Sequence, residues 1–285
     1  MKRFTVIFAI VFILIAAVIV YRVSHWGKFI DILNPDESLG SDVSESADFT
    51  PGFYDFVTPL LDSEGHIVKK DIRKIVLIGN CSLLTDPIKK ATGAEVVDLT
   101  VSGSYVTYES LDAVSERDND TPYNIAYRLC SDEGSKDISD ADVLIMYYEG
   151  TDYRLDRSMD AGGGLASYYD QLLGSLHLLS TTYPDLRIIL VGAPYITYTD
   201  GSDGETYKNK KGYIINDYAL AEYDIAVTKL NISYLDMCFD NINKEHSSEY
   251  QNPDCTLNDN GVNFIVSRIV SAIHYFDNVN EAEQK

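Results

Sequence analysis

The chain has 285 residues, of which 44 are acidic and 23 are basic, so its formal net charge at pH 7 is −21. This charge argues against a nucleic-acid partner, because nucleic-acid binding needs a basic surface. It also disfavours a protein that lies flat on an anionic membrane. The length suffices for one large domain with a substantial core.

A hydrophobic segment at residues 4–21, FTVIFAIVFILIAAVIVY, contains no charge, glycine or proline. As a helix it spans roughly 27 Å, close to the thickness of a hydrocarbon core. Lys2 and Arg3 place residues 1–3 in the cytoplasm and the remainder outside it. The alternative is a cleaved signal peptide, whose apolar region is shorter and ends in small residues. The length and the bulky residues 18–21 favour an uncleaved, single-pass transmembrane anchor.

Residues 22–52 are predicted to form an extracytoplasmic stalk, because they are rich in Ser, Asp, Glu, Gly and Pro (NPDESLGSDVSESADFTPG). The folded domain then comprises residues 53–285. We expect the chain to dock first on this domain at residues 53–61.

Short apolar runs alternate with amphipathic segments in the remaining sequence. The predicted strands are residues 74–79 (KIVLIG), 95–101, 142–148, 186–193 and 232–237. The predicted helices are residues 86–93, 122–130, 165–183, 211–230 and 260–276. This alternation predicts an α/β domain with a parallel sheet of five strands covered by helices on both faces, a three-layer α/β/α sandwich.

Four cysteines in an exported domain permit two disulfides, and their spacing does not select one of the three possible pairings. They are Cys81, Cys130, Cys238 and Cys255. No two histidines have zinc-ligand spacing, so neither a metal nor another cofactor is expected.

Sites in open parallel sheets form beyond the C-terminal ends of the strands. The residues there are Gly79-Asn80-Cys81-Ser82, Ser102-Gly103-Ser104, Glu149-Gly150-Thr151-Asp152, Ala193-Pro194 and, before the last helix, those from Asp254 to Gly261. This set resembles the SGNH/GDSL hydrolase superfamily, esterases and acyltransferases on a flavodoxin-like sheet. The resemblance covers residues 74–276 and rests on element order and on the stretch YYDQLLGSLHLLSTTYPDLRIILVGAP.

The resemblance implies where catalytic groups would stand. The family's Gly-Asp-Ser block, with Ser as nucleophile, corresponds to Gly79-Asn80-Cys81, and Gly103 fits the glycine whose N–H helps to form the oxyanion hole. The Gly-x-Asn-Asp block, whose Asn donates to the oxyanion, is one residue short here and ends in Asp152. In the final Asp-x-x-His block, Asp254 is present and Leu257 replaces the histidine base.

Two substitutes for the missing groups are open. Ser82 could be the nucleophile in a shifted alignment, and His246 could serve as base, although an exposed loop position is the simpler interpretation. His177, on a leucine-rich helix, is expected to be a partly buried packing residue.

In the fold that the resemblance implies, Cys81 and Cys255 face each other, which predicts a disulfide between them that closes the former active site. Cys130 and Cys238 would form the second disulfide. The alternative is four buried free thiols.

Tyrosines gather after the third and fourth predicted strands, where their rings could stack on sugars or simply pack at the rim. They are Tyr147, Tyr148, Tyr153, Tyr195 and Tyr198. Residues 162–164, three glycines, are a candidate mobile lid.

Three functional hypotheses follow. The first is a catalytically degenerate SGNH-like domain, an accessory or binding subunit of cell-surface polysaccharide modification with polysaccharide or envelope-biosynthesis proteins as partners. The second is an active esterase or O-acyltransferase on surface carbohydrate that uses atypical residues. The third is a sensory domain with an unrelated flavodoxin-like fold.

Overall fold

All five predicted strands lie in one parallel sheet. The computed structural model describes residues 51–60, 67, 71–80, 82–107, 135–160, 162, 164, 167–197 and 208–277, all within the unit Asp48–Lys285. The strands are β1 (Lys74–Gly79), β2 (Glu95–Asp98), β3 (Val143–Tyr147), β4 (Arg187–Val191) and β5 (Ser233–Leu235). Their spatial order is β2-β1-β3-β4-β5, and every pairing is parallel. This is the flavodoxin-like order, in which the chain reverses direction across the sheet between β1 and β3.

Successive residues of each central strand point to opposite faces and enter two separate cores. Val76, Ile78 and Leu144 belong to one buried cluster, and Ile75, Leu77 and Val143 belong to the other. Both sets are fully buried, which explains why these strands are continuously apolar rather than alternating. The sheet is therefore the middle layer of the predicted three-layer sandwich.

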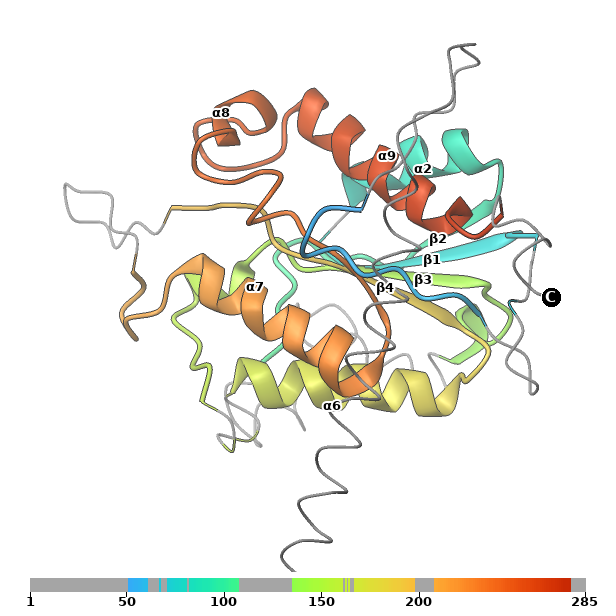
Figure 1. Cartoon of the computed structure of the whole chain (residues 1–285), viewed down its shortest axis with the longest axis horizontal. Coiled ribbons are helices and arrows are strands. Elements are labelled where there is room, and N and C mark those ends of the chain that lie inside the picture. Colours follow the sequence, from blue (N-terminus) through green and yellow to red (C-terminus); the bar gives the residue numbers. More distant parts are fainter. Residues whose placement is uncertain are drawn as a thin grey trace, which may run out of the picture. The chain divides into compact units, whose positions relative to one another are not determined.

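Helices cover both faces of the sheet (Figure 1). Helices α2 (Thr85–Thr92) and α9 (Asp259–His274) lie on one face, and α6 (Tyr168–Thr182) and α7 (Ile215–Tyr223) lie on the other. Short helices α5 (Thr151–Arg154) and α8 (Ser247–Tyr250), 3-10 turns at Ser82–Leu84 and Ser135–Asp137, and a π-helical segment at Asp224–Leu230 complete the described elements. Helix α2 ends at Thr92, and Gly93 caps it in the left-handed conformation.

The helix predicted at residues 211–230 is wrong at its start. Asn209 accepts hydrogen bonds from the backbone N–H groups of Lys211 and Tyr213, which fixes a turn there. Ile214 is extended, and its N–H donates to the Asp217 carboxylate at 2.8 Å, so the helix begins at Ile215. The second half is a π-helical segment, Asp224–Leu230, rather than α-helix.

The predicted docking of the chain at residues 53–61 is confirmed by an antiparallel bridge. Phe56 and Tyr234 exchange backbone hydrogen bonds of 2.8 and 2.7 Å, so that the segment Gly52–Thr58 covers the free edge of β5. Because it runs antiparallel to β5, its first residues lie at the C-terminal end of that strand. Thr58 N–H also donates to the Ser233 hydroxyl at 3.0 Å at the other end.

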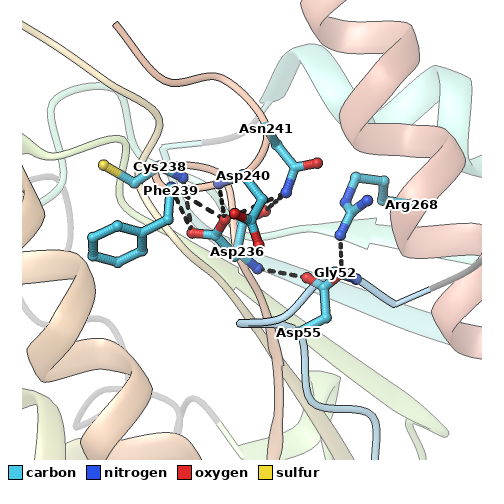
Figure 2. Close-up of polar contacts among 8 residues, drawn as sticks. All are labelled: Gly52, Asp55, Asp236, Cys238, Phe239, Asp240, Asn241 and Arg268. Carbon is cyan, nitrogen blue, oxygen red and sulfur yellow. Dashed lines mark hydrogen bonds and ion pairs between the residues drawn. The ribbon is translucent and has the colours of Figure 1, made fainter. Parts of the chain in front are cut away.

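A network of buried carboxylates fixes this segment (Figure 2). Asp55 accepts hydrogen bonds from the N–H groups of Gly52 and Asp236 and forms an ion pair with Arg268 on α9. Asp236 accepts from the N–H groups of Cys238, Phe239 and Asp240, closing the turn after β5. Burial raises the pKa of Asp236, and these backbone hydrogen bonds oppose the increase.

Several expectations fall outside the described residues: the anchor at residues 4–21, nearly all of the stalk at 22–52, and the helix at 122–130. Within the described part of the chain, no helix is both long and apolar enough to cross a membrane.

Candidate functional site

Asn80 and Glu149 form a side-chain pair at the C-terminal edge of the sheet. Asn80 follows β1, and its N–H donates to the carbonyl oxygen of Tyr147 at 2.7 Å. Its side-chain amide donates to Glu149 Oε2 at 2.9 Å. Since β1 and β3 are neighbours at the point where strand order reverses, this pair lies where open parallel sheets place ligands.

The backbone at this edge contains two non-glycine residues in the left-handed conformation. Glu149 has φ of 51° and Cys255 has φ of 65°. Such conformations are uncommon for residues other than glycine, asparagine and aspartate. In folded proteins they gather at ligand clamps and active sites, where surrounding structure holds them in place.

Glu149 is a carboxyl group that titrates near neutrality. Burial raises its pKa to about 7, the charge of Arg154 opposes that increase, and the charge of Asp254 adds to it. A group with this pKa can accept or release a proton at neutral pH. Arg154 and Asp254 are themselves exposed, so the edge combines one partly buried acid with a cation and an anion in solvent.

Replacing Glu149 with glutamine should stabilise the protein at pH 8 and leave its stability nearly unchanged at pH 4.5. Because the folded pKa exceeds 4.5, the ordinary value for glutamate in an unfolded chain, the stability that this group contributes in wild type falls as pH rises from about 4.5 to 7. The expected gain at pH 8 is about 1–3 kcal/mol, measured by urea unfolding. Exposed Glu95→Gln is the control, and a gain independent of pH would contradict the expectation.

Asp152 is a structural residue. It is 1% exposed, and its carboxylate accepts hydrogen bonds from Val106 N–H at 2.7 Å, Thr107 N–H at 3.0 Å and the Thr107 hydroxyl at 2.8 Å. Burial raises its pKa, and those hydrogen bonds oppose the increase. Asp152 thus holds the loop that follows β2 and Gly103 against α5.

Asp254 and Leu257 differ sharply in exposure. Asp254 is exposed, and hydrogen bonds from the hydroxyl and N–H of Thr256 lower the pKa of its carboxyl group. Leu257 is 6% exposed and packs in the core between the sheet and helices α2 and α9. A Cβ on Gly261 would lie 3.0 Å from the Leu257 side chain, so this position is tightly filled.

The histidines and serine considered from the sequence lie on the surface. His246 is exposed just before α8, and His177 is exposed on α6, so the expectation of a partly buried packing residue at His177 was wrong. Ser82 is exposed in the 3-10 turn after β1, and Gly103 is exposed with φ of 73°.

Comparisons with known proteins bear on the fold. No family model matches the chain, and no curated protein sequence does. A solved structure from Lactobacillus plantarum has a TM-score of 0.56 at 18% identity, covering 73% of this chain and 98% of that one. A GDSL-like lipase from Parabacteroides merdae (TM-score 0.45, 15% identity) covers 72% of this chain and 97% of that one. A carbohydrate acetylesterase from Sinorhizobium meliloti (TM-score 0.45, 12% identity) covers 72% and 99%.

The chain shares its α/β fold with the Lactobacillus plantarum protein, over a five-stranded parallel sheet of order β2-β1-β3-β4-β5. At these identities the likeness is one of fold, and activity must be argued from the residues themselves.

The positions that the sequence resemblance assigned to catalytic groups hold residues with other properties. The shortened block in which the oxyanion asparagine was sought ends in Asp152, and a buried carboxylate that accepts three hydrogen bonds is not an amide donor. Leu257 stands where the base is expected, in the core. Cys81, at the nucleophile position, lies outside the described residues.

The two predicted disulfides are not seen. Cys238, buried, and Cys255, partly buried, are free thiols, whereas Cys81 and Cys130 lie outside the described part of the chain. Cys255 Sγ is 3.6 Å from the Thr197 hydroxyl. Burial raises the pKa of the Cys238 thiol, so it is an unreactive core group.

The tyrosines of this set that the structure describes do not form a stacking surface. Tyr147, Tyr148 and Tyr153 are at most 5% exposed and belong to the core, so the expectation that they line the rim was wrong. Tyr195 is partly buried, and Tyr198 lies outside the described residues, as does one of the three glycines at 162–164.

The Asn80–Glu149 pair was missed by sequence reasoning, which singled out Cys81, Ser82, Gly103, Asp152 and Asp254. The available signal was that polar residues stand one residue after β1 and two residues after β3, and that these strands are neighbours. The raised pKa of Glu149 depends on burial and had no local signature.

Proposed function

We propose that the chain is a membrane-anchored, extracytoplasmic SGNH-fold domain that has lost serine–histidine catalysis. It would act as an accessory or binding subunit in the modification of cell-surface polysaccharide. The anchor rests on the hydrophobic segment at residues 4–21, and the polysaccharide class rests on the family resemblance and the inferred location.

The observation that carries this proposal is Leu257. Acyl transfer by a serine or cysteine nucleophile needs a base within hydrogen-bond reach, and loss of such a base typically costs several orders of magnitude in rate. A packed leucine fills the position where the family has its histidine. His246, just before α8, and His177, on α6, are both exposed, and neither side chain has a described hydrogen bond to Asn80 or Glu149.

The test is turnover of an aryl acetate by the full-length protein in detergent, compared with Cys81→Ala and Ser82→Ala. Equal background rates in all three proteins are expected. A loss of about 1000-fold in either variant would overturn the proposal, since that is the effect of removing a working nucleophile. Ser102→Ala, an exposed serine at the same edge, is the matched control.

Glu149 favours a second candidate, an esterase or O-acyltransferase that uses a carboxylate base. Its pKa of about 7 and its hydrogen bond to Asn80, next to the nucleophile position, suit general-base chemistry. In that case the rate should rise with pH through about 7 in wild type and be lost in Glu149→Gln. The same assay, run from pH 5 to 9, separates this candidate from a flat background rate.

A further inference from the structure

Glu222 is a second acid in an apolar setting, and it lies outside the candidate site. It is the penultimate residue of α7 and is 4% exposed. The Tyr168 hydroxyl donates to its Oε1 at 2.6 Å, and the Ala193 N–H donates to its Oε2 at 3.3 Å. Glu222 therefore joins α7, the first residue of α6 and the chain just after β4.

The site has little room to solvate a charge. A carboxylate offers about four acceptor positions, and the described residues supply two donors, one of them long. A Cβ placed on Gly192 would lie 3.2 Å from Glu222 Oε2 and 2.5 Å from the Tyr234 hydroxyl. The backbone at Gly192 therefore packs closely against the Glu222 carboxyl group and the Tyr234 hydroxyl.

The charges that act on Glu222 are also unfavourable to its ionisation. Asp152 on α5 and Asp236 after β5 are both acidic, and the other titratable groups facing it are Tyr168, Tyr234 and Cys238. Burial raises the pKa of Glu222 to about 7, the hydrogen bonds from Tyr168 and Ala193 oppose that increase, and the two aspartates add to it.

Glu222 lies close to a change of helix type and to the sheet edge that carries Asn80 and Glu149. The chain changes from α-helix to the π-helical segment Asp224–Leu230 two residues later, and π-helical turns often mark functional sites. On the other side, a Cβ on Gly150 would lie 3.6 Å from Ala193 Cβ. Ala193 is therefore a close neighbour of Gly150, the residue after Glu149.

We propose that the Glu222–Tyr168 pair is a proton-dependent switch. When Glu222 is protonated, α7 packs tightly against the end of β4. When Glu222 ionises, the sheet edge that carries Asn80 and Glu149 loosens. This proposal rests on the proposed function only in taking that edge as the functional site, whose packing the switch would regulate. No ligand and no turnover are needed to observe it.

The sign of the effect follows from the two protonation states. Between about pH 4.5 and 7 the folded chain holds a proton on Glu222 that the unfolded chain has released. Stability from this group is therefore greatest at low pH, falls as pH rises towards 7, and is constant above it. From pH 5 to pH 8 the unfolding equilibrium constant should rise on the order of 100-fold through Glu222 alone.

The test is urea unfolding of the full-length protein from pH 5 to 9 in wild type, Glu222→Gln and Tyr168→Phe. Glu222→Gln should remove the 100-fold component. Tyr168→Phe removes a hydrogen bond that favours the ionised form, so the decline in stability should extend to higher pH than in wild type. Tyr169→Phe is the matched control, because the Tyr169 hydroxyl donates at 2.6 Å to Asp224, a carboxylate outside this cluster.

Hydrogen exchange tests whether the sheet edge loosens when Glu222 ionises. Amide exchange is measured for residues 148–152 and 192–197 and corrected for its intrinsic pH dependence. Protection in both segments should fall above pH 7 in wild type and stay constant in Glu222→Gln. An unchanged pH dependence in Glu222→Gln, or a shift to lower pH in Tyr168→Phe, would overturn the proposal. If the aryl acetate assay contradicts the proposed function, these measurements still decide the switch.

Discussion

Alanine at Gly79 is expected to prevent folding or to destabilise the protein by at least about 4 kcal/mol. Gly79 has φ of 98°, outside the conformations that residues with a side chain adopt readily. A Cβ there would lie 2.1 Å from the carbonyl oxygen of Tyr147, a backbone atom of the neighbouring strand β3. The clash can be relieved only by separating two central strands. Circular dichroism and urea unfolding of Gly79→Ala would measure the loss.

Gly93→Ala is the control for that substitution. Gly93 also has positive φ, 70°, but a Cβ there would meet no atom within 4 Å. Its cost should therefore be only the conformational one, about 1 kcal/mol. Equal losses at the two positions would show that the contact with Tyr147 is not the cause.

Removal of the Asp55 carboxylate should cost about 3–5 kcal/mol, because it would leave Arg268 largely buried without its anionic partner. The Asp55 side chain is 0% exposed and that of Arg268 is 12% exposed. The same substitution removes the acceptor for the N–H groups of Gly52 and Asp236 (Figure 2). Urea unfolding of Asp55→Ala is the measurement.

An exposed ion pair supplies the comparison for Asp55. Lys229 and Asp224 are 3.9 Å apart with side chains 47% and 41% exposed, and Lys229→Ala should change stability by less than about 1 kcal/mol. If Asp55→Ala lowers the free energy of unfolding no more than Lys229→Ala does, the carboxylate network does not fix the segment Gly52–Thr58.

The strands were predictable because a strand buried on both faces appears in the sequence as an unbroken apolar run. The run KIVLIG is β1 from its first to its last residue, since Ile75 to Ile78 are fully buried and Gly79 ends the strand with positive φ. The predicted strand at residues 95–101 also keeps hydrogen bonds to β1 as far as Val101, although regular β2 ends at Asp98. The start of α7 was not predictable, because apolar spacing continues through Tyr213. The boundary is decided by backbone N–H groups that donate hydrogen bonds to the Asn209 and Asp217 side chains.

The candidate site was predictable only in part. Parallel topology places Asn80 and Glu149 at one edge, and the departure at Leu257 is visible in the sequence. The raised pKa values of Glu149 and Glu222 arise from contacts between distant elements, such as Tyr168 on α6 with Glu222 on α7. The tyrosines illustrate the same limit, since sequence position after a strand does not tell whether a ring turns outward or, like Tyr153, into the core.

The bridge between Phe56 and Tyr234 has a consequence for self-association. An open edge strand presents unpaired N–H and C=O groups on which another chain can add a strand. Here β5 is paired on its outer side by a segment of its own chain, and the opposite edge strand, β2, is only four residues long. A protein shortened past Thr58 would expose Ser233 to Leu235 as a template for intermolecular pairing. Aggregation of such a fragment would therefore reflect an uncovered sheet edge rather than a weak core.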